Sequence, residues 1–300
     1  MYQSKKKSRL GDVSAYFFLL PAIVLSVLFI VVPLILTFRY SFTDWSGLGE
    51  YNNIGFQNFQ NLMSDSVFWE SIKTTFIWVL LYVICLPITS LILALVLEFG
   101  MPFKSLKPVG RTIFFMPMMM SMAAVALLWQ LIFNPNLGIL PKLLTMLGVT
   151  TTSVDFLGDY NFAIFAAFIP IIWQSSGFGM VIYSAAIQGI PLDVLESASI
   201  DGCTKWKAIW HIVVPMLAPT VALLATLNLV NGFKAFDLLY IPTAGGPGTS
   251  TQVTSIYIFQ QAFVSNYYGY SSAMSLILFF ITVIFGVLFF KTSNRLENYV

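Results

Sequence analysis

Apolar residues in this chain gather in six long runs separated by polar segments. Each run is about 20 residues long or longer and mostly apolar, the length that a helix needs to cross the hydrocarbon core of a bilayer. Charges flank the runs and do not interrupt them, because a charge at the bilayer centre costs about 3 kcal/mol or more. The pattern predicts an all-α, polytopic membrane protein with six transmembrane helices at about Ser14–Phe38, Thr74–Leu97, Thr112–Phe133, Phe162–Ile187, Ile212–Phe233 and Ser272–Phe290.

Composition supports this fold class, since 58% of the residues are hydrophobic and only 9% are charged. A soluble domain carries about 25% charged residues. We expect a single six-helix membrane domain over residues 14–291, a basic N-terminal tail over residues 1–13 and a C-terminal tail over residues 292–300.

The basic residues predict the orientation of the chain in the membrane. Eleven of the fifteen Lys and Arg residues fall on the side that holds both termini and the loops after the second and fourth runs. Cytoplasmic loops carry this excess, so both termini and the loop at about 188–211 are predicted to be cytoplasmic. Topology accounts for the net charge of +2, and no nucleic-acid partner is expected.

The loop between the fourth and fifth runs contains a short segment with the features of a capped helix. Pro191 suits its first turn, and Gly202 suits a left-handed stop with φ > 0. The acidic Asp193 and Glu196 favour the positive N-terminal end. One narrow apolar or small face, suited to a groove on a partner, is formed by Leu192, Leu195, Ala198 and Ser199.

An amphipathic connector resting on lipid is the alternative interpretation of this segment. Helices that rest on lipid favour Lys and Arg, whereas this segment carries Asp193, Glu196 and Asp201. The acidic charges therefore favour a protein partner.

No catalytic residue and no metal site is predicted. The sequence lacks the G-x-x-x-x-G-K-[ST] phosphate loop, so the chain itself is expected to bind neither ATP nor another cofactor. Its one histidine, His211, has no partners nearby in sequence, and Cys85 and Cys203 lack zinc spacing. We therefore expect a non-catalytic protein.

Polar residues inside two of the runs indicate where a solute would pass. Gln174, Ser175 and Phe178 share a helical face in the fourth run, and Asn228, Asn231 and Lys234 share one in the fifth. Amides and hydroxyls beside an aromatic ring suit a sugar, whose hydroxyls need hydrogen-bond partners. The alternative is that these groups only join helices, with hydrogen bonds worth about 0.6 kcal/mol each.

The loop also carries a recognisable motif. Glu196-Ser197-Ala198 is followed by three residues and Gly202, then by nine residues, Ile212 and, three positions on, Pro215. This pattern resembles the EAA loop of membrane subunits of binding-protein-dependent, ATP-driven importers. Ser197 and Val214 depart from the family's alanine and leucine.

The likeness runs nearly end to end and is to the carbohydrate branch of that family. The block from Phe233 to Gly248 is similar to the first permease of the maltose and glycerol-3-phosphate type. The other similar segments are Ser41-Phe42-Thr43-Asp44-Trp45, Phe68-Trp69, Arg111-Thr112-Ile113-Phe114-Phe115-Met116-Pro117, Phe133-Asn134-Pro135 and Tyr268-Gly269-Tyr270.

This resemblance implies a multi-pass permease of the bacterial inner membrane that translocates a sugar or related solute. It implies a heterodimer with a second permease, an extracytoplasmic solute-binding protein, and two cytoplasmic ATPase subunits that use ATP and Mg. It also implies that Gln174, Ser175 and Phe178 occupy positions that contact sugar. The residues implied in ATPase coupling are Pro191, Leu192, Leu195, Glu196, Ser197, Ala198, Asp201, Gly202, Ile212 and Pro215.

Two other classes of function stay open at this point. A secondary transporter driven by an ion gradient places ionisable residues near mid-membrane or breaks helices in matched halves. The runs contain prolines but no carboxylate relay, which disfavours this class. A purely structural membrane subunit would provide no path for solute.

Overall fold

The computed structural model describes residues 9–101, 103–148 and 154–297, and every regular element within these ranges is a helix. The predicted all-α class is confirmed. The chain divides into two compact units, Met1–Ser64 with Gln260–Ile277, and Asp65–Phe259 with Leu278–Val300. Residues 1–8 and 298–300 of the predicted tails lie outside the described residues, and α1 begins at Arg9, within the predicted N-terminal tail.

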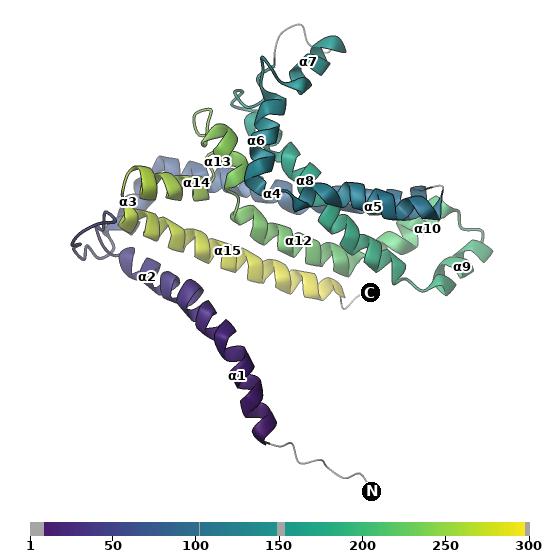
Figure 1. Cartoon of the computed structure of the whole chain (residues 1–300), viewed down its shortest axis with the longest axis horizontal. Coiled ribbons are helices and arrows are strands. Elements are labelled where there is room, and N and C mark those ends of the chain that lie inside the picture. Colours follow the sequence, from purple (N-terminus) through teal and green to yellow (C-terminus); the bar gives the residue numbers. More distant parts are fainter. Residues whose placement is uncertain (1–8, 102, 149–153, 298–300) are drawn as a thin grey trace. The chain divides into compact units, whose positions relative to one another are not determined.

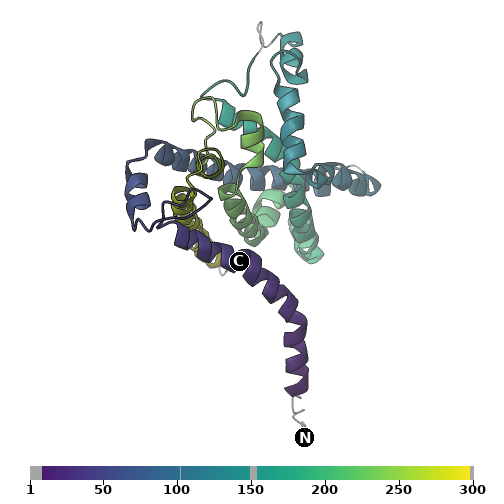
Figure 2. The same ribbon diagram turned by 60° about the vertical axis from the view of Figure 1, so that its left-hand side comes forward.

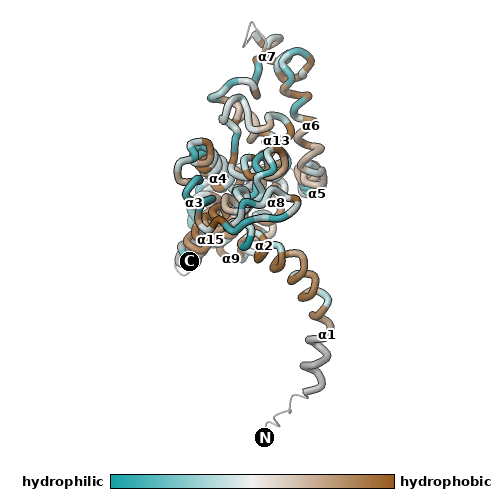
Figure 3. Tube along the Cα trace, turned by 90° about the vertical axis from the view of Figure 1, so that its left-hand side faces the viewer, coloured by the Kyte–Doolittle hydropathy of each residue, from teal (hydrophilic) through white to brown (hydrophobic). Residues whose placement is uncertain are grey.

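The first unit starts with an apolar helical stretch that its own chain does not cover. None of the segment Phe18–Tyr40 is buried inside the chain, and Figure 3 shows α2 with the adjoining part of α1 as hydrophobic. Such a helix is stable where lipid replaces water around its side chains. The helices of this unit are α1 (Arg9–Ser26), η1 (Val27–Val31), α2 (Val32–Tyr40), α3 (Gln57–Ser64), η6 (Gln260–Val264) and the start of α15 (Tyr268–Glu297).

Polar contacts order the loop that follows α2. The buried side chain of Asn58 donates hydrogen bonds of 2.9 Å to the carbonyl oxygens of both Ser41 and Thr43. The backbone N–H of Asn52 donates to the Asp44 carboxylate at 2.6 Å, and this bond lowers the pKa of Asp44 below its ordinary value. The loop thus has a fixed conformation although it lacks regular structure.

The second unit is a bundle in which α4 contacts both α8 and α12 (Figures 1 and 2). Its core includes Trp78 and Tyr82 of α4, whose rings meet Phe168 of α8 at 5.2 and 5.5 Å. The elements are α4 (Ser66–Leu95), η2 (Val96–Gly100), η3 (Lys104–Leu106), α5 (Lys107–Phe115), η4 (Met116–Met119), α6 (Met122–Phe133), α7 (Ile139–Met146), α8 (Ala163–Gln188), α9 (Leu192–Ile200), α10 (Lys205–Ala208), η5 (Ile209–Val213), α11 (Val214–Met216), α12 (Ala218–Phe233), α13 (Asp237–Thr243), α14 (Thr254–Phe259) and the rest of α15.

Glycines allow the close approach of these helices. A Cβ added at Gly177 of α8 would lie 2.1 Å from the carbonyl oxygen of Phe114, and one added at Gly232 of α12 would lie 3.0 Å from the Cα of Val79. Small residues bring membrane helices together because association in lipid depends on close packing. These two glycines set the spacing of α8 against α5 and of α12 against α4.

Among the residues that the structure describes, four helices are long and apolar enough to cross a membrane singly, and two bent pairs bring the number to six if each pair is one span. The single spans are Phe18–Tyr40, Ser66–Gly100, Ala163–Gln188 and Tyr268–Lys291. They match the first, second, fourth and sixth predicted spans, with ends shifted by several residues.

The third and fifth predicted spans correspond to the two bent pairs. The third bends by 97° between Lys107–Met119 and Met122–Phe133, and the fifth bends by 60° between Lys205–Met216 and Ala218–Phe233. At the first bend Ser121 is extended and its Oγ accepts from the N–H of Ala124, which starts a new helix. At the second bend Pro219 cannot donate the next helical hydrogen bond.

Candidate functional site

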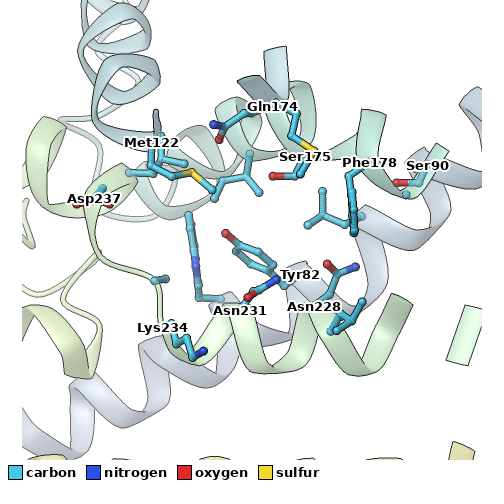
Figure 4. A pocket seen from close by; sticks show the side chains of 18 of the residues that line it. Tyr82, Ser90, Met122, Gln174, Ser175, Phe178, Asn228, Asn231, Lys234 and Asp237 are labelled. Carbon is cyan, nitrogen blue, oxygen red and sulfur yellow. The ribbon is translucent and has the colours of Figure 1, made fainter. Parts of the chain in front are cut away.

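A cavity of about 630 Å³ lies inside the second unit, between α4, α8, α12, the start of α13 and the bend of the third span. All six residues predicted for the solute path line it, namely Gln174, Ser175, Phe178, Asn228, Asn231 and Lys234. Figure 4 shows the three residues of α8 on one side and the three from the C-terminal end of α12 on the other, with Tyr82 between them. The structure thus brings the two predicted faces together, and contact with a solute stays a prediction.

Gln174 is the most constrained polar group of this cavity. Its side chain is only 3% exposed, and its Nε2 donates a hydrogen bond of 2.8 Å to the carbonyl oxygen of Met120, at the bend of the third span. Within the described residues, no donor reaches its Oε1. A buried acceptor without a donor costs about 1–3 kcal/mol, and this oxygen is closed off as the side chain stands, so a hydroxyl or water reaches it only after the side chain moves toward the cavity.

The opposite wall carries amides and two opposite charges. Asn228 and Asn231 extend from α12, while Lys234 and Asp237 line the end of the cavity where α13 begins. Amides both donate and accept, as do the hydroxyls of Ser175 and of a sugar. The cavity can therefore hold an uncharged, hydroxyl-rich molecule through many weak polar contacts.

Sequence reasoning missed the wall that α4 provides. Trp78, Tyr82, Leu86 and Ser90 line the cavity at a spacing of four residues. That spacing places them on one helical face, and this regular face with its polar Tyr82 and Ser90 was a signal available in the sequence. Phe236 and Asp237, two and three positions after Lys234, were also missed.

The predicted coupling helix is present as α9, and the left-handed stop at Gly202 is confirmed with φ +76°. The N–H of Cys203 donates to the carbonyl oxygen of Ala198 at 2.9 Å, and that of Gly202 to Ser199 at 3.1 Å. These two bonds form a Schellman motif. Pro191 precedes the first helical residue, Leu192, and acts as the N-cap, one position before the expected place.

The predicted apolar face of α9 is divided between the chain and solvent. Leu195 packs against a buried cluster of this chain and Ala198 is half-buried, so they do not form one free face with Leu192 and Ser199. The exposed apolar side chains of the helix are instead Leu192 at 71%, Val194 at 38% and Ile200 at 87%. Packing against neighbouring segments decided which side of α9 faces outward, and the sequence of the helix alone did not show it.

The other predicted coupling residues are spread over this region. Glu196, Ser197 and Asp201 are exposed on or directly after α9, beside the exposed Gly202. Ile212 lies in η5 and Pro215 in α11, within the first half of the bent fifth span. Figure 1 shows α9 and α10 at the same end of the second unit.

Comparison with known proteins identifies the family. Residues 87–297 match the binding-protein-dependent transport system inner membrane component. The chain belongs to this family. The match covers α9 and the parts of the cavity wall that follow residue 87, while Trp78, Tyr82 and Leu86 of α4 lie before it.

Relatives extend the similarity over nearly the whole chain. The permease protein YurN of Bacillus subtilis, a probable ABC transporter permease, is 33% identical over 93% of this chain and 97% of its own length. The multiple sugar-binding transport system permease protein MsmF of Streptococcus mutans is 31% identical over 93% of this chain and 95% of its own length. The chain is therefore a multi-pass permease of an ABC transport system, similar to relatives named for sugar transport.

Solved structures agree with this assignment. A chain of a bacterial ABC transporter involved in the import of the acidic polysaccharide alginate superposes with a TM-score of 0.83 at 26% identity, covering 95% of this chain and 96% of that chain. A chain of a bacterial alginate ABC transporter, solved in complex with an alginate pentasaccharide-bound periplasmic protein, superposes with a TM-score of 0.82 at 25% identity, covering 95% of this chain and 95% of that chain.

Proposed function

We propose that this chain is the membrane-spanning permease subunit of an ATP-driven importer, and that it translocates a sugar or a related polyhydroxylated solute. The observation that carries this proposal is the cavity of about 630 Å³, where polar faces of α8 and α12 and aromatic residues of α4 meet within a membrane bundle. A cavity of this size and lining is typical of a small-molecule site.

The chemistry of the lining favours hydroxyl groups. Sugar hydroxyls accept from the amides of Asn228 and Asn231 on one wall, and a hydroxyl on the other side donates to the Oε1 of Gln174 once that side chain moves toward the cavity. The exposed ring of Phe178 offers an apolar face for the C–H side of a sugar ring. Gln174 is the residue that we expect to contribute most to solute recognition.

The partners follow from the family and from α9. We expect a second permease that completes the pathway as a heterodimer, a solute-binding protein on the external side, and two ATPase subunits that bind ATP and Mg. The alginate transporter, solved with its periplasmic protein, supports this arrangement. Both termini and α9 are proposed to lie in the cytoplasm of a cell whose plasma membrane holds the complex.

We propose that an ATPase subunit binds α9. Its exposed Leu192 and Ile200 form apolar contacts, and Glu196 and Asp201 add charge. A helix that presents such a surface to a groove is a common recognition mode. The Schellman motif at Gly202 fixes the direction in which the chain leaves α9, so that a displacement of α9 also displaces α10.

A transporter driven by an ion gradient is not favoured, since the family consists of components of binding-protein-dependent systems. A structural subunit without a path is not favoured either, because the predicted polar faces enclose a cavity.

The direct test of the solute class is uptake by a strain that lacks this gene. Labelled mono-, di- and oligosaccharides, sugar acids, polyols, glycerol phosphate and, for comparison, amino acids are offered one at a time. We expect uptake of one carbohydrate or close set to fall to background and to return with the wild-type gene. Loss confined to amino acids would refute the carbohydrate assignment.

A further inference from the structure

A cluster of charged and polar side chains lies where α4 and η2 end, outside the cavity. Glu98 of η2 has a side chain that is only 6% exposed, and it forms ion pairs with Lys107 at 2.9 Å and with Arg111 at 3.3 Å. The Nε2 of Gln188 donates to the same carboxylate at 3.0 Å. We call Glu98, Lys107, Arg111 and Gln188 the Glu98 cluster. It connects the end of α4–η2, the start of α5 and the end of α8.

The residues on either side of α9 both contact the end of η2. Gln188 is the last residue of α8 and precedes α9. Lys205, the first residue of α10, follows α9, and its Nζ donates to the carbonyl oxygen of Phe99. Two consecutive residues, Glu98 and Phe99, therefore hold the chain before and after α9.

Apolar packing reinforces the same connection. Ile190 is buried in the cluster that also contains Leu97, and Leu195 of α9 and Phe99 pack against it. Gly110 of α5 brings its backbone close to Leu97, since an added Cβ would lie 3.0 Å from the Leu97 Cδ1. The ends of α4–η2, α5 and the α9 loop are thus in continuous contact.

This arrangement has a mechanical consequence. The chain joins α9 directly to α8 and, through α10, to the fifth span, whereas α4 and α5 have no covalent link to it nearby. Hydrogen bonds in which the donor or the acceptor is ionised are roughly twice as strong as neutral ones, and the Glu98 side chain that accepts them is only 6% exposed. Glu98 and Phe99 connect the α9 loop to the ends of α4 and α5 through non-covalent contacts. From there α5 continues through η4 to Met118 and Met120, which line the cavity.

We propose that Glu98 is a positioning residue that passes displacement of α9 to the second and third spans, so that four spans around the cavity respond to the ATPase together. The inference rests on the proposed function, since it assigns the route by which α9 acts on the solute cavity.

The test uses the complete transporter in proteoliposomes, with the Glu98→Ala variant and two measurements. ATPase docking, measured by pull-down with the tagged permease, is expected to stay at the wild-type level because α9 keeps its exposed surface. Stimulation of ATP hydrolysis by solute-loaded binding protein, and solute taken up per ATP, are expected to fall at least about fivefold, the lower end of usual coupling between sites. A purely structural role would instead lower docking and thermal stability together.

A pair of exposed lysines provides a matched control. Lys205→Met removes the bond to Phe99, whereas Lys207→Met removes an equal charge two positions later whose side chain is exposed. We expect reduced stimulation for Lys205→Met and wild-type behaviour for Lys207→Met. This pair decides the question if Glu98→Ala fails to assemble.

The outcomes separate this inference from the proposed function. Wild-type stimulation in both Glu98→Ala and Lys205→Met, in a transporter that imports solute with ATP, overturns the positioning role alone. Equal loss in Lys205→Met and Lys207→Met also overturns it, because charge and not the bond would then matter. Absence of ATP-dependent uptake by the wild-type complex overturns the proposed function and the inference with it.

Discussion

Gly202 offers a test in which the backbone conformation alone changes. This residue has φ +76° at the end of α9, and a Cβ added to it would have no atom within 4 Å. The Cβ of Gly202→Val therefore meets no neighbouring atom, and we expect the substitution to act through the conformation of the residue. The left-handed region costs roughly 1–2 kcal/mol for a residue with a Cβ, and more for a β-branched one.

The expected loss follows from this free energy. About 1.4 kcal/mol corresponds to a factor of ten. We therefore expect the fraction of Gly202→Val molecules whose chain leaves α9 in the native direction to fall roughly 5- to 30-fold. Asn tolerates the left-handed region better than other residues with a Cβ. Gly202→Asn is therefore the matched control and is expected to lose much less.

The assay is a titration of the purified ATPase subunits against tagged permease, together with ATP hydrolysis stimulated by the binding protein. Gly202→Val is expected to weaken docking about tenfold, with normal amounts of protein in the membrane. If Gly202→Val docks like wild type, or if Gly202→Asn is as damaging as Gly202→Val, the Schellman motif has no role in coupling.

Three further predictions concern the coupling helix, the cavity and the bundle. Glu196→Lys reverses an exposed charge on α9 and is expected to reduce binding-protein-stimulated ATP hydrolysis while the membrane content stays normal; unchanged stimulation would mean that this charge does not face the ATPase. Gln174→Ala and Asn231→Ala are expected to lower solute uptake severalfold with assembly intact, since a lost hydrogen bond to solute is worth about 0.5–1.5 kcal/mol; normal uptake kinetics would assign both residues to helix joining. Gly177→Ala places a Cβ 2.1 Å from a backbone oxygen and is expected to destabilise the protein in detergent by about 1–3 kcal/mol, whereas Gly286→Ala, with open space around it, leaves the melting temperature unchanged.

The sequence predicted the features that depend on local spacing. Gln174, Ser175 and Phe178 share a helical face by their spacing, as do Asn228 and Asn231, and both faces line one cavity. The stop at Gly202 was also predictable, because glycine is the residue that favours a left-handed C-terminal position.

Features that depend on tertiary contacts were not predictable from the sequence. Pro117 alone does not indicate a 97° bend, which also involves the bond from Gln174 to Met120 and the close approach of Gly177 to Phe114. Leu195 faces the interior of the chain because it packs against a buried cluster formed by other helices. Glu98 appeared in the sequence only as a charge flanking a span, and its ion pairs with Lys107 and Arg111 form only when the ends of α4 and α5 meet.

The central claim, that this chain is the permease of an ATP-driven sugar importer, is tested most directly by uptake into proteoliposomes. The vesicles hold the purified complex of both permeases and the ATPase subunits, with sugar-loaded binding protein outside and either ATP with Mg inside or an imposed Na⁺ or H⁺ gradient without nucleotide. We expect labelled sugar to accumulate with ATP and the binding protein, to stay at background with a gradient alone, and to accumulate less when Gln174→Ala replaces the wild-type chain. Accumulation driven by a gradient without ATP, or ATP-driven uptake that does not require this chain, would contradict this claim.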